Sequence, residues 1–363
     1  MLLLIAVANA HYWFAPDLKA SEPFEELVSD LLYLLVDGRA YPLFALLLGF
    51  GLATIAHRSI QVSLAEGLNR KQAEQRATSQ LRRRGLWLLA FGTAHALIFA
   101  HDILGVYGLV TVLIARIVVS RRSRTALVLA VLTGSLSMTF IAVVGPAAAL
   151  TRSHGLAAHT LFDAHIVGVM FNLAVWTVST PVTVLSSMVL PSVLLGAWLA
   201  GQGMLEKPYL HRQELAGTVL AGFVVPTVTF PMLWVSIDGA DVPSRFLIAW
   251  HQSLAGMLAG AGYLALVALV VSCIAGTGIF SRILAATGKR SLSTYLSQTL
   301  LLALGAGALR ICGVETLALA WQVFVATTVW LVSILVCSLM EYHGIKGPAE
   351  RGLRRLVATG VPR

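Results

Sequence analysis

Apolar residues form long runs along most of the chain, and short polar segments separate them. A helix needs about 20 consecutive apolar residues to cross a bilayer, so the pattern predicts an all-α, polytopic membrane bundle of about ten transmembrane helices in a single domain. The predicted spans lie near residues 1–15, 41–57, 85–100, 103–119, 125–146, 181–200, 214–235, 253–275, 292–310 and 317–340.

Two connecting segments have patterns of their own. Residues 16–40 mix acidic residues with leucines at helical spacing, which predicts an amphipathic helix along the outer membrane surface. Residues 57–84 contain seven Lys/Arg and two glutamates. This long basic segment favours either a solvated helix beside anionic lipid headgroups or a cradle for a polyanionic ligand.

The charges of the connectors predict the topology. With an inside N-terminus, the inside segments hold 21 of the 26 Lys/Arg; these segments are 57–84, 116–124, 201–214, 276–291 and 341–363. The outside segments hold five Lys/Arg but eleven of the seventeen Asp/Glu. Basic residues accumulate in cytoplasmic loops. Both termini are therefore predicted to be cytoplasmic, with residues 341–363 as a basic tail.

The composition excludes several classes of protein. Hydrophobic residues make up 57% of the chain and charged residues only 12%, whereas a soluble domain has about 25% charged residues. The formal net charge of +9 is explained by the cytoplasmic loops, and we expect no nucleic-acid partner. His154, His159, Asp163 and His165 are irregularly spaced and lack a ligand motif, so no metal site is predicted.

Residues 82–107 combine a basic start with histidines in an apolar run. On one continuous helix, the eleven steps from Arg84 to His95 rise about 16 Å and return to nearly the same face. Arg84 is therefore expected at the cytoplasmic mouth and His95 at depth. An ionisable side chain at that depth is a functional hypothesis; the alternative is a neutral histidine bonded to a neighbouring helix.

His101 and Asp102 follow at the outer end of the same predicted helix. A carboxylate near an imidazole sets its tautomer and raises its basicity. Asp102 lies two turns beyond His95, about 10 Å further along a straight helix. That separation predicts no direct contact, so any coupling between them requires a water molecule or a bend.

The motif that contains His95 and Asp102 resembles that of a known family. Arg84-x10-His95, followed by His101-Asp102-Ile103-Leu104-x-x-Tyr107, resembles the centre of the YeiB-like bacterial membrane proteins, a family of unknown function. Further matching motifs lie at residues 42–51, 288–298 and 347–351, so the resemblance covers nearly the whole chain and implies the bacterial cytoplasmic membrane. The polar segment that usually leads into the first span is missing here, which predicts a natural start upstream of Met1.

The YeiB-like family is similar in turn to the transmembrane acyltransferases, including the acyltransferase-3 enzymes and the heparan N-acetyltransferase type. This resemblance implies an acyl-CoA donor, such as acetyl-CoA, and a hydroxyl or amine acceptor. It implies catalytic roles for His95 and Asp102 and an acceptor-side position for His101 and Tyr107. The implied binding residues for CoA are Arg82, Arg83, Arg84, Lys289 and Arg290.

Two other functional classes fit the same residues. A transporter or permease would use the polar column from Arg84 to His95, with helices broken at Pro226 and Pro231, as a path for a solute or a proton. A structural membrane scaffold would not depend on His95. Beyond the lipid bilayer, the expected partners are acyl-CoA, an unknown acceptor and a second copy of the chain.

Overall fold

The computed structural model describes residues 1–16, 23–120, 123–153, 166–229, 242–273, 278–314 and 316–358. Nearly all of these residues are helical. The helices are α1 Leu2–Ala10, α2 Pro23–Leu35, α3 Ala40–Ala65, α4 Arg70–Ala96, α5 Leu104–Val119, α6 Ser123–Ser153, α7 Ile166–Ser186, α8 Val189–Leu199, α9 Arg212–Val228, α11 Val242–Cys273, α12 Ile279–Gly288, α13 Ser291–Ile311, α14 Leu319–Tyr342 and α15 Pro348–Ala358, with a short 3-10 turn at Pro208–Leu210. Two-residue strands, β1 Ala15–Pro16 and β2 Thr316–Leu317, pair in parallel.

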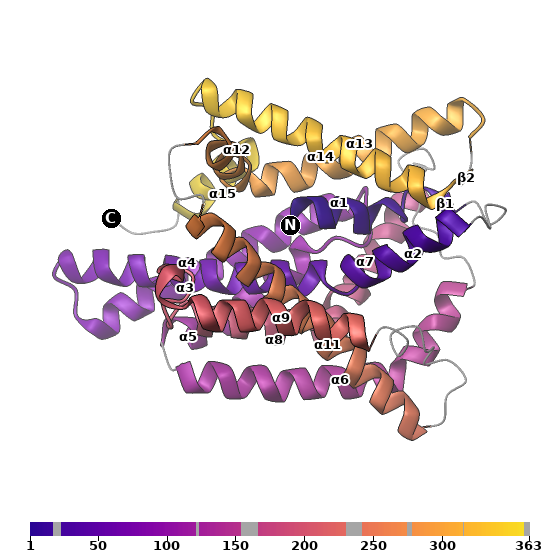
Figure 1. The fold of residues 1–363 in the computed structure, drawn as a ribbon. Helices are drawn as coiled ribbons and strands as arrows, with labels where there is room; N and C mark the ends of the chain where they lie inside the picture. Colours follow the sequence, from indigo (N-terminus) through magenta and orange to yellow (C-terminus); the bar gives the residue numbers. More distant parts are fainter. Residues whose placement is uncertain are drawn as a thin grey trace.

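Figure 1 shows the long helices side by side, with two different ends. The end at the left of the view carries α12, α15 and the tip of the α3–α4 hairpin, all from segments predicted to be cytoplasmic. The opposite end carries α2 and the β1–β2 pair, from segments predicted to lie outside. The last described helix, α15, lies at the basic end, whereas the N-terminus lies about midway along the bundle, so the predicted cytoplasmic position of the termini is not confirmed.

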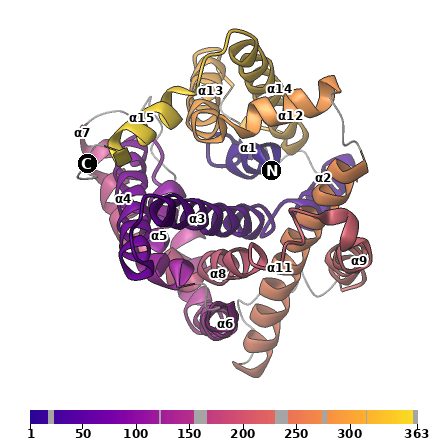
Figure 2. The ribbon, with the colours of Figure 1, turned by 90° about the vertical axis from the view of Figure 1, so that its left-hand side faces the viewer.

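Figure 2 views the bundle along its helices, with α3 at its centre between α1 and α8. Glycines allow α3 and α8 to approach closely: a Cβ atom on Gly49 would lie 1.9 Å from the carbonyl oxygen of Val193. The reverse contact is equally close, since a Cβ atom on Gly196 would lie 2.0 Å from the oxygen of Leu46. Small residues at crossing points are typical of membrane helices, because close backbones gain van der Waals contact.

The chain is a multi-pass, all-α membrane protein. Six helices in the described residues are long and apolar enough to cross a membrane, in the ranges Pro23–Ala65, Arg124–Val143, Gly168–Ser186, Pro243–Cys273, Ser291–Ile311 and Leu319–Tyr342. Shorter apolar helices lie at Leu104–Val119 and Val189–Leu199. The predicted number of about ten spans is not confirmed. The nine-residue α1 is about 14 Å long by helical rise, which is half of a membrane core.

The predicted span at 181–200 is wrong. The helix α7 begins at Ile166 and ends at Ser186, and α8 is a separate helix that begins at Val189. The sequence predicts an outside segment at 147–180, in which Asn172 and Trp176 indicate a part at the membrane interface or partly inserted. Both side chains are buried in the bundle, so their polar atoms lie in the protein interior and do not indicate a loop.

The basic segment at 57–84 forms the end of α3 and the beginning of α4, with a turn between them. Asn69 caps α4: its side chain accepts a hydrogen bond from the backbone N–H of Gln72, whose own side chain accepts one from Asn69 N–H. This reciprocal capping box fixes the start of α4. The two helices extend the membrane bundle into a hairpin at its basic end (Figure 1).

Candidate functional site

The site residues predicted at depth lie where α4 ends and α5 begins. These two helices pack closely through glycines: a Cβ atom on Gly92 would lie 2.4 Å from Gly105 N and 2.6 Å from Asp102 Oδ2. Likewise, a Cβ atom on Gly108 would lie 2.5 Å from Leu89 N. The glycines therefore bring the turn after α4 back against α4 itself.

His95 and Asp102 are in direct contact. The distance between His95 Nδ1 and Asp102 Oδ1 is 2.7 Å, and the two side chains have only 4% and 0% exposure. The prediction that they are too far apart is wrong. It assumed one straight helix through both residues, whereas α4 ends at Ala96 and the chain turns before Asp102.

Asp102 is held by groups from two further places. Its Oδ2 accepts a hydrogen bond of 2.7 Å from the backbone N–H of Gly105, in the first turn of α5. The hydroxyl of Tyr295, on α13, lies 3.4 Å from Oδ1. The Tyr295 ring also lies 5.2 Å from the His95 ring, centroid to centroid. The carboxylate thus fixes the orientation of the imidazole and is itself fixed by α5 and α13.

The second nitrogen of His95 is free. Nε2 is buried and has no hydrogen-bond partner among the described residues. A carboxylate at Nδ1 favours the tautomer with its proton on Nδ1, which leaves a lone pair on Nε2. Buried polar atoms are nearly always paired, so a free ring nitrogen at this depth is available to a ligand or a reacting proton.

The two residues expected on the acceptor side differ in their surroundings. His101 stacks on Tyr12, with ring centroids 4.5 Å apart. Tyr107 is buried, stacks on Phe44 at 5.0 Å, and its hydroxyl has no hydrogen-bond partner in the described part of the chain. Both belong to the aromatic side chains near the His95–Asp102 pair, and the Tyr107 hydroxyl has no hydrogen bond to that pair in the described residues.

A cavity of about 1400 Å³ lies at the basic end of the bundle, beside Arg84. Three of its arginines, Arg58, Arg84 and Arg354, have no ion pair or hydrogen bond in the described residues, while a fourth, Arg76, pairs with Glu66. The three come from α3, α4 and α15. Burial lowers the pKa of Arg84, an effect that the nearby Glu350 carboxylate opposes. Arginine stays charged regardless, since its ordinary pKa is far above neutral.

Arg82 and Arg83 are neighbours of Arg84 but do not line this cavity. Arg82 is exposed. Arg83 is half-buried, and its Nε and one terminal nitrogen have no partner among the described residues. Of the predicted basic triplet, only Arg84 therefore faces the cavity.

Lys289 and Arg290 are engaged by the protein itself. Lys289 Nζ lies 2.6 Å from Glu341, and Arg290 donates to the same carboxylate at 2.7 Å. Arg290 is 4% exposed and also donates to the backbone oxygens of Ala286 and Ile345. These two residues join α12, α13 and the end of α14, and they are not among the residues that line the basic cavity.

The C-terminal helix α15 closes one side of the basic cavity. Glu350 accepts hydrogen bonds from the backbone N–H groups of Leu292 and Ser293, at 2.7 and 3.0 Å. A carboxylate at the beginning of a helix satisfies its free N–H groups and interacts favourably with its dipole. Glu350 therefore fastens α15 to α13 and brings Arg354 to the cavity.

Sequence reasoning missed several of these residues. The sequence shows Tyr295 only as part of the motif at 288–298. It shows Arg58 and Arg354 only as basic residues that predict the topology. No group of three or more His, Cys, Asp or Glu side chains that could hold a metal ion occurs in the residues described. The histidines at positions 154, 159 and 165, together with Asp163, lie outside those residues.

Comparison with known proteins gives limited information about the family. No curated protein and no solved structure matches the chain. Residues 199–360 match the model of a family described as "Protein of unknown function (DUF418)". Tyr295 and Arg354 lie within the matched region, and His95 and Asp102 lie before it. The match supports a relationship of this part of the chain to a domain-of-unknown-function family.

Proposed function

We propose that this membrane protein is an acyl-CoA-dependent acyltransferase that transfers an acyl group to a hydroxyl or amine acceptor. One observation carries the proposal: His95 is buried, its Nδ1 lies 2.7 Å from Asp102, and its Nε2 has no partner among the described residues. A histidine oriented by a carboxylate is the usual arrangement for a general base. The resemblance to the transmembrane acyltransferases supports the choice of reaction.

The pair accounts for the proton in such a reaction. Asp102 holds the Nδ1 proton of His95, so Nε2 removes the proton from the acceptor as the acceptor attacks the thioester carbonyl carbon. The C–O or C–N bond forms and the C–S bond breaks. The proton then passes from Nε2 to the leaving CoA thiolate, which balances the reaction without an outside acid or base.

The basic cavity supports the site for the donor. The guanidinium groups of Arg58, Arg84 and Arg354 have no ion pair among the residues that the structure describes, and a guanidinium group can bind two phosphate oxygens at once. By helical rise, Arg84 and His95 are about 16 Å apart along α4, a distance that an extended pantetheine arm covers. We propose Arg58 and Arg354 as donor-binding residues instead of Lys289 and Arg290, because Lys289 and Arg290 are already paired with Glu341.

The bacterial cytoplasmic membrane is the proposed location, with the donor on the basic side. The test is equilibrium binding of acetyl-CoA to the purified protein in detergent, together with release of CoA thiol when hydroxyl and amine acceptors are added. We expect acetyl-CoA to bind and to raise the Tm, and Arg84→Gln to weaken both effects.

The transporter alternative gives the opposite pattern. In reconstituted vesicles it predicts flux of a solute along the column from Arg84 to His95, which Arg84→Gln and His95→Gln reduce, without acetyl-CoA binding to the wild-type protein. That result would exclude the acyltransferase.

A further inference from the structure

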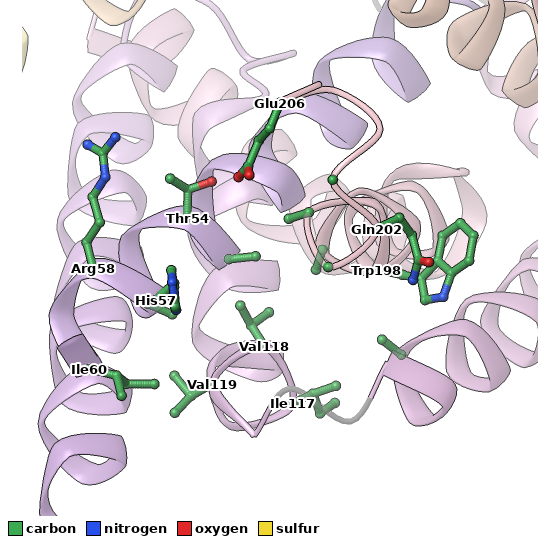
Figure 3. Close-up of a pocket in the computed structure, with 17 residues that line it drawn as sticks. Thr54, His57, Arg58, Ile60, Ile117, Val118, Val119, Trp198, Gln202 and Glu206 are labelled. Atoms are coloured by element: carbon green, nitrogen blue, oxygen red, sulfur yellow. The ribbon is translucent and has the colours of Figure 1, made fainter. Parts of the chain in front are cut away.

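A second cavity, of about 560 Å³, lies between α3, α5, α6, α8 and the turn that follows α8. Its volume is within the range of small-ligand sites, roughly 300–1000 Å³. Figure 3 shows aliphatic side chains along one side, among them Ile60, Val118 and Val119. On the other side, the carboxylate of Glu206 points toward Thr54, with His57 close by. The cavity therefore has an apolar floor and a polar rim.

The rim carries both signs of charge. Arg58 on α3 and Glu206 on the turn after α8 both line the cavity. Both residues are exposed, and neither side chain has an ion pair or a hydrogen bond in the described residues. His57 and Gln202 add neutral donors and acceptors. A ligand that offers an anion to Arg58 and a cation to Glu206 would satisfy both groups at once.

The cavity lies at the depth expected for lipid headgroups. Arg58 lies where the apolar part of α3 gives way to the basic hairpin, and the floor residues Val118 and Val119 are the last residues of α5. Trp198, near the end of α8, also lines the cavity. Tryptophan is enriched at membrane–water interfaces, and basic residues mark the cytoplasmic side. The cavity therefore lies at the boundary between the hydrocarbon core and the headgroups, with apolar and charged side chains lining it at this depth.

We infer that this cavity binds a phospholipid whose headgroup contains a phosphate and a primary amine, as in phosphatidylethanolamine. The phosphate pairs with Arg58 and accepts a hydrogen bond from His57, the ammonium pairs with Glu206, and an acyl chain lies on the apolar floor. The inference does not rest on the acyltransferase proposal, although Arg58 lines both cavities; Glu206 lines this cavity and not the basic one, so it separates the two.

The charge pattern selects among lipids. An anionic headgroup such as that of phosphatidylglycerol offers Arg58 the same phosphate but brings no cation to the Glu206 carboxylate, so the ion pair with Glu206 is lost. A choline headgroup has the same net charge but no N–H donors for the carboxylate, so it forms no charge-assisted hydrogen bond. A water-soluble phosphoamine lacks the chains that bury the floor, and burial of apolar area is the larger part of such binding.

The test is native mass spectrometry of the purified full-length protein with an equimolar mixture of short-chain phosphatidylethanolamine, phosphatidylcholine and phosphatidylglycerol. We expect the ethanolamine adduct to exceed each of the others by about fivefold, the effect of one partly exposed ion pair. Glu206→Gln removes this preference, and Arg58→Gln lowers all three adducts. Phosphoethanolamine without chains does not displace the lipid.

Matched variants control for surface charge. Glu214 is an exposed glutamate on α9 that lies 3.6 Å from His211 and does not line the cavity, so Glu214→Gln keeps the preference. Arg212→Gln is the control for Arg58. Glu206 does not line the basic cavity beside Arg84, so its effect is separable from donor binding. Equal retention of the three lipids, a larger glycerol adduct, or an unchanged preference in Glu206→Gln would each overturn the inference.

Discussion

The polar side chains near the end of α4 and those in its middle differ in how they are paired. Near the C-terminal end of α4, His95 contacts Asp102 at 2.7 Å and both side chains are almost fully buried. At the basic end, Arg84 shares a large cavity with Arg58 and Arg354, and none of the three has an ion pair among the described residues. His95 has its counter-charge in direct contact, whereas Arg84 has the Glu350 carboxylate nearby but no ion pair in the described residues.

This difference separates positioning from binding. A carboxylate buried next to an imidazole fixes the ring in one orientation and one tautomer, which suits proton transfer. Cations without protein partners leave their pairing to a ligand, which suits an anionic substrate. Arg290 shows the contrast at the same end of the bundle, because Glu341 and backbone oxygens already occupy its donors.

The largest effect is expected from a substitution in the His95–Asp102 pair. Asp102→Asn removes the charge that fixes the His95 tautomer, so we expect acyl transfer to fall by about 100-fold to 10,000-fold while acetyl-CoA still binds. Thiol release and equilibrium binding, measured on the same preparation, check both parts. Asp30→Asn on α2 is the matched control and keeps full activity. A loss of binding equal to the loss of rate would show that Asp102 only supports the fold.

Arg290→Gln tests the claim that this arginine is structural. Loss of its bonds to Glu341 and to the oxygens of Ala286 and Ile345 is expected to destabilise the protein by about 2–4 kcal/mol. The affinity for acetyl-CoA is expected to stay the same. Thermal unfolding in detergent and ligand titration measure the two quantities. Weaker donor binding at unchanged stability would restore Arg290 to the binding site.

Gly92→Ala tests the close packing that brings Asp102 to His95. The added Cβ atom would lie 2.6 Å from Asp102 Oδ2, so α4 and the turn must separate, at a cost of about 1–3 kcal/mol. Activity falls with stability, since the pair is pushed apart. Gly51→Ala is the control, because a Cβ atom there meets no atom within 4 Å. Equal Tm values for the two variants would contradict this packing.

Arg84→Gln gives the smallest effect in free energy. We expect the dissociation constant for acetyl-CoA to rise about tenfold, the value of one charge-assisted hydrogen bond. The Tm without ligand should not fall, because Arg84 has no ion pair to lose. Arg82→Gln is the comparison, since Arg82 is exposed and does not line the cavity. An equal effect of both variants would indicate a general surface potential instead of a site.

The sequence predicted helices where apolar runs were long and uninterrupted, as in α5, α11, α13 and α14. It failed at α7, because Asn172 and Trp176 have polar atoms and their burial depends on partners elsewhere in the chain. The contact of His95 with Asp102 depends on the end of α4 at Ala96, and residues 97–101 contain no glycine or proline that would signal this end. The resemblance implies that Lys289 and Arg290 bind CoA, and the sequence could not show their pairing with Glu341, which is about 50 residues away along the chain.

General-base catalysis by His95 is tested most directly by the rate of CoA thiol release in a single turnover at saturating acetyl-CoA. His95→Gln keeps a polar side chain but no titratable nitrogen, and His343→Gln replaces an exposed histidine as the control. The expected result is a rate at least about 100-fold lower in His95→Gln, with wild-type rates in His343→Gln and unchanged donor binding in both. Wild-type thiol release by His95→Gln would contradict the role of His95 as the base.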